Sequence, residues 1–399
     1  MRKQVILLFT VIAMFGMTGC WSRVELNDVA IVTATALDLA DRNKIQVSIQ
    51  VLRINMNNAS GGNATVLFSE EGESILDAYR IIQKKIPRHL NFAHNRVIIV
   101  GDKLARSGMS DVIEFFSRYR DARGNSYLLA TKGKAADLLK IGPSFEKFTA
   151  EEIREEQKAK VIDNVSLREF AYRLLEGGIE PIASQIQSVP SSDKALTSSN
   201  NDKKKQNNEW SLALVGVGVF RKDHLIGWMN AEEAECLLWF RNKVKGSVIT
   251  TMLTGDKRES GKLSVQIMKS KTTIKPKLQE EKVSFDVRVE MIGDLYENTT
   301  KLSTNSLKNL ETIQLAVEAE IQSRIKSTVK KLQLKYKSDI VGFGRMLHRE
   351  HKKEWNERFE KRWEQEFPHV KVNVTAHFKI IGTGRINDSL TWEERDFKK

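Results

Sequence analysis

The sequence predicts an α+β fold with three domains, each a β-sheet packed with helices. Apolar runs of strand length alternate with amphipathic helical segments in the first part of the chain, as in a sheet covered by helices. A polar stretch over 188–208 interrupts this pattern, and regular strands with a long amphipathic helix dominate the last third. The predicted segments are a leader over 1–19, an N-terminal α/β-type domain over 20–187, a polar linker over 188–209, a small middle domain over 210–258 and a C-terminal α+β domain over 259–399.

The N-terminal segment shows the strand period and the helix period in turn. Residues 45–52 alternate apolar and polar side chains, which is typical of a half-buried strand. Residues 73–86 space their apolar side chains as on a helix, and Pro87 ends that helix. The same reasoning predicts strands at 29–37, 95–101 and 126–131, a helix at 110–119 with Ser110 as its N-cap, and a short helix at 134–140.

The predicted middle domain begins with an apolar run over 211–220, which indicates a strand buried on both faces. A helix follows from Asn230. Asn230 and Glu233 have the spacing of a capping box, in which each side chain bonds to the backbone N–H of the other residue.

The C-terminal segment is the most regular part of the sequence. Its alternating and helical patterns predict strands at 262–268, 283–291 and 369–381, a long amphipathic helix at 306–336 and a second helix at 345–366. The second helix carries an aromatic residue at every fourth position: Trp355, Phe359, Trp363 and Phe367. We expect these rings to cover the sheet of their own domain; a surface for a partner helix is the alternative.

Composition narrows the class of protein. Of the 399 residues, 41% are hydrophobic and 29% are charged, which is ordinary for a globular protein. The net charge of +13 favours acidic surroundings such as nucleic acid, an anionic membrane surface or an anionic polymer, without choosing among them. Two cysteines form at most one disulfide, so the chain is not a disulfide-stapled scaffold.

The N-terminus has the order of parts found in a lipoprotein signal peptide over 1–19. Arg2 and Lys3 precede an uncharged apolar stretch, Val5 to Met17, and "MTGC" follows. This resembles a lipobox, in which the thiol of Cys20 takes a diacylglycerol and cleavage leaves Cys20 as the first residue. The alternative is an uncleaved transmembrane anchor. If Cys20 is lipidated, Cys236 is a lone thiol, and we expect it to be a small buried hydrophobe.

No pattern in the sequence indicates catalysis. His348 and His351 lie three positions apart, whereas zinc-protease pairs lie four apart with a glutamate after the first histidine. His377 falls on the polar face of its strand, and His89 and His94 flank a predicted turn. There is no nucleophile elbow or P-loop. We therefore expect no catalytic residue, cofactor or metal, and no nucleic-acid partner, since basic charge alone supports one.

Five ordered blocks resemble the Ger(x)C family, the lipoprotein C subunits of spore germinant receptors in endospore-forming bacteria. They begin with "CWSRVELNDVAIVTATALD" and end with "YKSDIVGFGRMLHREHKKEW", and the only visible departure is Met17 in the lipobox. The blocks are 20–38, 86–101, 227–240, 270–277 and 336–355.

The resemblance implies three α+β domains and a lipid-anchored, non-enzymatic subunit on the outer face of the spore inner membrane. There the subunit would join a membrane-embedded A subunit and a transporter-like B subunit. Only the lipidated cysteine of the family carries over by position, onto Cys20.

Two other functions remain open at this point. One is an extracytoplasmic solute-binding lipoprotein that captures the germinant itself, which should have two similar α/β lobes around a cleft. The other is an anion-binding cell-wall module, for which net charge is the only support.

Overall fold

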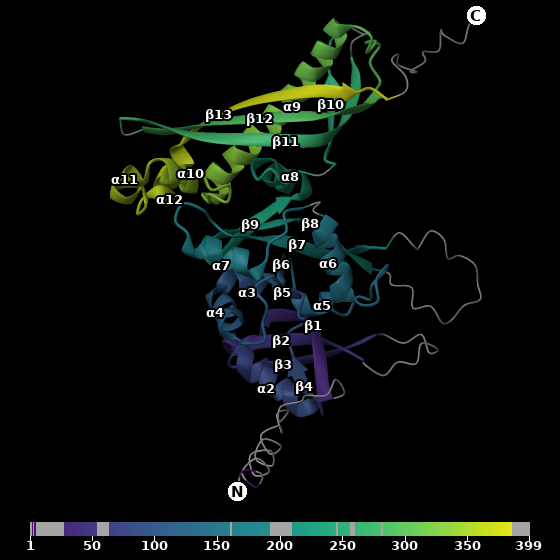
Figure 1. Cartoon of the computed structure of the whole chain (residues 1–399), viewed down its shortest axis with the longest axis vertical. Coiled ribbons are helices and arrows are strands. Elements are labelled where there is room, and N and C mark those ends of the chain that lie inside the picture. The colour runs from purple at the N-terminus through teal and green to yellow at the C-terminus, as the bar shows by residue number, and fades with distance from the viewer. Residues whose placement is uncertain are drawn as a thin grey trace, which may run out of the picture.

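The computed structural model describes Arg2, Gln4 and residues 28–53, 64–159, 162–191, 210–244, 246–255, 260–280 and 282–384. These residues form a mixed α/β structure in which β-sheets pack against helices, as predicted. Figure 1 shows the two sheets following one another along the longest axis of the molecule, with helix α8 (Ala231–Phe240) between them.

The first sheet is built mostly from the N-terminal half of the chain. Its order is β3-β2-β1-β5-β6-β7-β8-β9, and β4 pairs with β1 beside this path. The pairs β1–β5, β5–β6 and β6–β7 are parallel, whereas β1–β2, β2–β3, β7–β8 and β8–β9 are antiparallel. The strands are β1 (Val29–Leu39), β2 (Ile45–Leu52), β3 (Thr65–Gly72), β4 (His89–Asn91), β5 (Val97–Gly101), β6 (Tyr127–Thr131), β7 (Ile182–Pro190), β8 (Trp210–Arg221) and β9 (His224–Asn230).

Helices cover both faces of this sheet, which explains why β5 is an unbroken apolar run. Ile98 and Val100 join the cluster under α2 (Ile75–Lys85), α4 (Ser110–Arg118) and α7 (Leu167–Leu175). Val97 and Ile99 join the cluster on the other face. The remaining helices of this region are α3 (Asp102–Ser107), α5 (Ala135–Leu138) and α6 (Thr149–Ala159), and the last two cover that second face.

The boundary between the two sheets does not fall at the predicted linker. β7 and β8 flank the stretch 192–209, which lies outside the described residues, and they pair with each other from Ile182 with Val219 to Pro190 with Trp210. β8 and β9 therefore continue the N-terminal sheet, whereas β10 (Val248–Leu253) joins the second sheet. The segment predicted as a middle domain thus contributes strands to both sheets.

The second sheet has the order β10-β11-β12-β13. β11 (Gly261–Gln279) and β12 (Lys282–Asn298) form a long antiparallel hairpin, and β13 (Lys371–Gly382) adds in parallel to β12. The predicted long helix is present as α9 (Leu307–Lys331). It continues through a π-helical turn, η4 (Leu332–Tyr336). Its apolar stripe is buried against one face of this sheet (Figure 1).

The predicted single helix over 345–366 is wrong, because the chain there is broken into short pieces. His351 has non-helical dihedral angles and separates the first piece from the rest. A straight helix would separate Trp355 and Trp363 by about 12 Å along its axis. Their ring centroids are in fact 5.6 Å apart, so the break lets the aromatic rings converge. The pieces are α10 (Phe343–Glu350), α11 (Lys352–Glu354), η5 (Trp355–Phe359), α12 (Trp363–Glu366) and η6 (Phe367–His369).

The aromatic residues of this region line the core of their own domain, as expected. All four rings are at most 5% exposed. Trp363 packs against Phe285 of β12, and Phe367 stacks on Phe343.

Two local predictions about helix starts had different outcomes. The capping box at α8 is present, with both bonds between Asn230 and Glu233. Ser110 is not an N-cap: it is the first helical residue of α4, and Met109 holds the cap position. The Ser110 hydroxyl instead donates to Asp223, in the turn between β8 and β9, at 2.7 Å.

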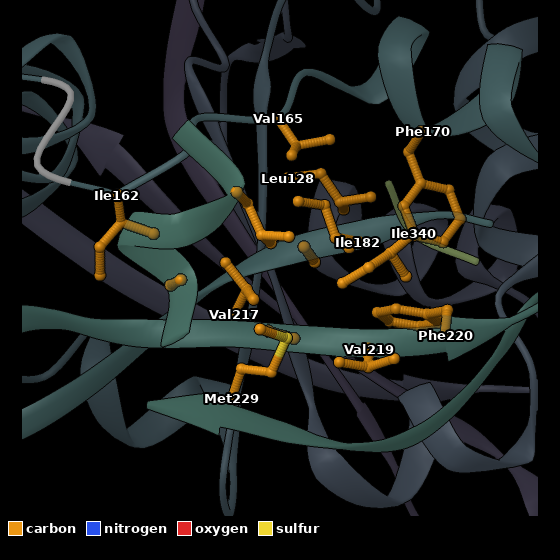
Figure 2. Close-up of a cluster of buried hydrophobic side chains, with 14 of the residues drawn as sticks. Leu128, Ile162, Val165, Phe170, Ile182, Val217, Val219, Phe220, Met229 and Ile340 are labelled. Atoms are coloured by element: carbon orange, nitrogen blue, oxygen red, sulfur yellow. The ribbon is translucent and has the colours of Figure 1, made fainter. Parts of the chain in front are cut away.

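The core of the first sheet also takes in a residue from the C-terminal part of the chain. Figure 2 shows Ile340 among Phe170, Ile182 and Phe220, between α7 and strand β8. Ile340 is fully buried. The two sheets are therefore joined by shared apolar packing as well as by polar contacts.

Candidate functional site

The one predicted site residue, Cys20, lies outside the described residues, so lipidation remains a prediction. Within the described ranges, no helix combines the length and the apolar character needed to cross a membrane. No group of three histidine, cysteine or acidic side chains in those ranges could hold a metal ion. Cys236 is 1% exposed, and burial raises the pKa of its thiol to about 12. It is the buried hydrophobe that the sequence predicts.

The histidines take ordinary positions in the described chain. His348 stacks on Trp355, with ring centroids 5.6 Å apart, and His351 occupies the break after α10. His377 is exposed on β13, 3.9 Å from Glu318 of α9. None of these arrangements resembles a catalytic or metal-binding site.

The segment after η4 and the first residues of α10 gather around one buried carboxylate at the junction between the sheets. The carboxylate of Asp339 is 3% exposed and accepts three backbone N–H bonds, from Gly342, Phe343 and Gly344, at 2.8 to 3.0 Å. The indole N–H of Trp363 donates a fourth bond at 3.0 Å. Burial raises the pKa of Asp339 to about 6, although these four bonds favour the charged form.

The glycines around Asp339 are required by close backbone packing. A Cβ on Gly344 would lie 2.5 Å from the indole nitrogen of Trp363 and 2.7 Å from the Cα of Gly178. Gly178 itself has φ +79°, and a Cβ there would meet the carbonyl carbon of Gly344 at 2.5 Å. The sequence "SDIVGFG" is therefore a tight packing element, which we name the Asp339 joint (residues 338–344).

The Asp339 joint bonds directly to the N-terminal sheet and its loops. The Ser338 hydroxyl donates to the carbonyl of Phe220 at 2.6 Å, and the N–H of Glu180 donates to the carbonyl of Asp339 at 2.9 Å. Just outside the joint, the Tyr336 hydroxyl donates to the carbonyl of Trp228 at 2.6 Å. These bonds fix the position of one sheet relative to the other.

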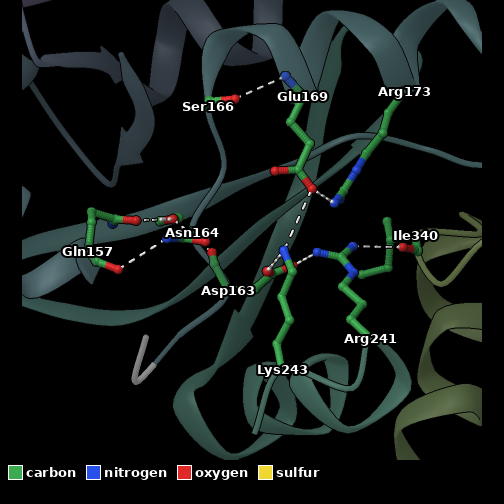
Figure 3. A network of polar contacts seen from close by, with 10 residues as sticks. Gln157, Asp163, Asn164, Ser166, Glu169, Arg173, Arg241, Lys243 and Ile340 are labelled. Atoms are coloured by element: carbon green, nitrogen blue, oxygen red, sulfur yellow. Dashed lines mark hydrogen bonds and ion pairs between the residues drawn. The ribbon is translucent and has the colours of Figure 1, made fainter. Parts of the chain in front are cut away.

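A second polar cluster lies beside the joint (Figure 3). Arg241, at the C-terminal end of α8, forms an ion pair with Asp163 and donates to the carbonyl of Ile340 at 3.1 Å. Lys243 lies 3.2 Å from Asp163 and 3.9 Å from Glu169, which also pairs with Arg173. Burial lowers the pKa of Arg241 to about 9, so it stays charged at neutral pH and Asp163 has a counter-charge.

These two clusters hold parts of the chain together, and large buried side chains pack between the sheets. The residues between the sheets are large and buried: Phe343 is 0% exposed and Trp355 is 1% exposed. A binding protein with two lobes around a cleft would instead have a solvated space there. The buried charges therefore stabilise the fold. The sequence does not predict these clusters, because the charge of a side chain does not indicate whether that side chain is buried. The one usable signal was the glycine spacing after Asp339.

Glu180 offers a test of the electrostatics at the junction. Its carboxylate accepts the backbone N–H of Lys222, and burial raises its pKa to about 7. A raised pKa means that the folded state binds the proton more tightly, so stability falls as the pH rises from about 4.5 to about 7. We expect Glu180→Gln to raise the free energy of unfolding at pH 7.5 by about 2 kcal/mol and to change it little at pH 4.5.

Denaturant unfolding of both chains at the two pH values measures this effect. The matched control is Glu114→Gln, which makes the same change in charge on the exposed surface of α4. Equal pH dependence in wild type and Glu180→Gln would contradict the assignment.

The fold and the junction define a class: a multi-sheet α/β protein whose buried polar groups at the junction serve structure, with no metal-holding cluster in the described residues. Residues 22–188 match the family model described as "Spore germination protein N-terminal domain". Residues 215–384 match the model described as "Spore germination B3/ GerAC like, C-terminal". The chain belongs to the Ger(x)C family, as the sequence blocks predicted.

Relatives match nearly the whole chain. Spore germination protein KC of Bacillus subtilis (strain 168) is 24% identical over 414 residues, which cover 99% of each chain. Spore germination protein B3 of the same organism is 26% identical and covers 94% of this chain and 96% of its own. The crystal structure of the GerBC protein has a TM-score of 0.56 at 23% identity, and covers 87% of this chain and 96% of its own, which supports the fold.

Proposed function

We propose that this chain is a non-enzymatic, lipid-anchored subunit of a spore germinant receptor, needed for nutrient-triggered germination. The observation that carries the proposal is that both halves of the chain match models of spore germination proteins. The buried charges support a non-enzymatic role, because Asp163 and Asp339 bind other parts of the fold.

The proposed location follows from the leader. Export and lipidation at Cys20 would place the folded chain on the outer face of the spore inner membrane. The partners would be a membrane-embedded A subunit and a transporter-like B subunit. Two or more acyl chains on one cysteine suffice for stable anchoring, whereas a single chain is marginal.

Co-purification from spore membranes tests the proposal directly. With an affinity tag on this chain, we expect two membrane proteins of the A and B classes to be recovered in stoichiometric amounts. Spores that lack the chain should lose the response to at least one nutrient, and the wild-type chain should restore it. Recovery of the chain alone, together with an unchanged nutrient response, would reject the role of receptor subunit.

The solute-binding alternative makes a different prediction. Isothermal titration of the purified chain with amino acids and sugars would then show tight, stoichiometric heat. We expect no such heat, because the junction between the sheets is filled by buried side chains.

A further inference from the structure

The second sheet is covered by helices on one face only within the described residues. Helix α9 packs on the face to which Phe285, Val287 and Val289 of β12 contribute, and these side chains are at most 1% exposed. Arg288 and Glu290, which alternate with them, are exposed on the opposite face. Figure 1 shows α9 on one side of the sheet. We name the opposite side the open face, formed by alternate residues of β11, β12 and β13.

Cations dominate the open face. β11 contains five lysines and no acidic residue, and β13 contains two lysines and no acidic residue. Lys277 pairs with Asp286 at 2.5 Å. Four other exposed lysines lie on this face: Lys269, Lys271, Lys275 and Lys379. No carboxylate of the described chain forms an ion pair with them.

Strand register places Lys269, Lys271 and Lys275 of β11 in one row beside β12, and Lys379 of β13 on the other side of β12. Lys269 lies opposite Ile292, which lies opposite Lys379; Lys271 lies opposite Glu290. Neighbouring strands are about 4.8 Å apart, so Lys379 of β13 lies about 10 Å across the sheet from the lysine row of β11. A narrow segment laid along β12 would meet a cation on each side at Ile292.

The open face is also hollowed. A hollow of about 540 Å³ is lined by Lys269, Lys271, Ile292 and Lys379, with Glu290 and His377 in the next row. Ile292 is half-buried between two lysines, whose aliphatic stems extend the apolar surface around it. The hollow therefore offers an apolar floor inside a rim that contains three lysines and one carboxylate, Glu290.

We propose that the open face binds an acidic segment of a partner protein, and that an apolar side chain of that segment occupies the hollow at Ile292. An apolar centre with a charged rim is the usual composition of a protein–protein contact. A phosphate polymer or a lipid headgroup would use the lysines but has no side chain to place on Ile292. The inference goes beyond the proposed function, because it holds for any partner of this chemistry.

Binding of defined probes to the full-length chain tests the inference. The main probe is a short fluorescent peptide of glutamates and glycines with one central leucine; a second peptide has glycine in place of that leucine. A polyglycerol phosphate and vesicles of phosphatidylglycerol represent polymer and membrane. We expect the leucine peptide to bind best and to bind more weakly as salt rises.

Two variants with the same change in net charge distinguish binding at the open face from a general effect of charge. The variant K271E/K275E/K379E should weaken binding of the leucine peptide by at least ~10-fold. The control K84E/K103E/K326E makes the same change in charge at exposed lysines of α2, α3 and α9, and should bind like wild type. Circular dichroism and melting temperature check that both fold, and the milder pair K271A/K379A supplies a second measure.

Several results would overturn the inference. Equal loss in both triple variants would mean that net charge, and not the open face, binds the peptide. Equal binding of the two peptides would remove the role of Ile292. Stronger binding of the polymer or the vesicles than of the leucine peptide would reject a protein partner at this face. So would equal binding of that peptide to wild type and to K271E/K275E/K379E.

Discussion

Replacing Cys20 with alanine should abolish lipidation of the chain entirely. The order of a basic start, an apolar stretch and "MTGC" places the thiol of Cys20 where a diacylglycerol would be added. Alanine has no nucleophile to take the lipid. Incorporation of a labelled fatty acid, followed on a gel, should therefore be clear for wild type and absent for Cys20→Ala. Mass spectrometry of the wild-type N-terminus should show that residues 1–19 have been removed.

The second cysteine provides the control for this experiment. Cys236 is 1% exposed, and burial raises the pKa of its thiol to about 12, so it should not react with lipid in the folded chain. Cys236→Ala should therefore keep the full label. Equal label in wild type and Cys20→Ala would contradict lipidation at Cys20. An unlabelled wild type that retains Met1 would indicate an uncleaved membrane anchor instead.

A lipid on Cys20 would also restrict how the molecule stands on the membrane. Asp28, the first residue of the continuous described chain, is eight positions after Cys20, so a fully extended tether spans less than about 30 Å. The first strand, β1, belongs to the N-terminal sheet, which lies toward one end of the longest axis (Figure 1). The second sheet lies toward the opposite end. The open face would then lie away from the anchoring site, where it could meet a protein partner.

The sequence predicts elements well where their pattern is local. The alternation over 45–52 is β2, and the stripe over 306–336 is α9 with its π-helical turn. The capping box at Asn230 is a contact between residues three positions apart, and it is present. Helices α6 and α7 were not predicted, although Ser166 caps α7 through the backbone N–H of Glu169.

Features set by contacts between distant residues could not be predicted in the same way. β7 and β8 pair across the predicted linker, because strand pairing depends on partners that local periodicity does not identify. The break after His351 serves the convergence of Trp355 and Trp363, which only the folded chain brings together. The pairing of Asp163 with Arg241 joins residues 78 positions apart, and nothing in either neighbourhood indicates it.

Asp339→Ala should destabilise the protein more than any other single change at the junction. The substitution leaves the buried backbone N–H groups of Gly342, Phe343 and Gly344 without an acceptor, and the indole N–H of Trp363 as well. Each stranded buried donor costs about 1–3 kcal/mol. The buried charge opposes folding at pH 7 by about 3 kcal/mol, since the pKa is raised from 3.8 to about 6. The four donors together cost about 4–12 kcal/mol, which outweighs this relief, so we expect a net loss of about 1–9 kcal/mol.

Urea unfolding followed by tryptophan fluorescence measures this loss in the free energy of unfolding. The signal reports on the junction, because Trp355 and Trp363 both lie there. Asp339→Asn is the matched control: it keeps the size and one acceptor oxygen, so its loss should be smaller than that of the alanine variant. Gly344→Ala, whose Cβ would meet Trp363 at 2.5 Å, should shift the same transition. If Asp339→Ala unfolds at the wild-type urea concentration, the carboxylate does not hold the joint. The joint would then depend on the apolar packing of Ile340 and Phe343 alone.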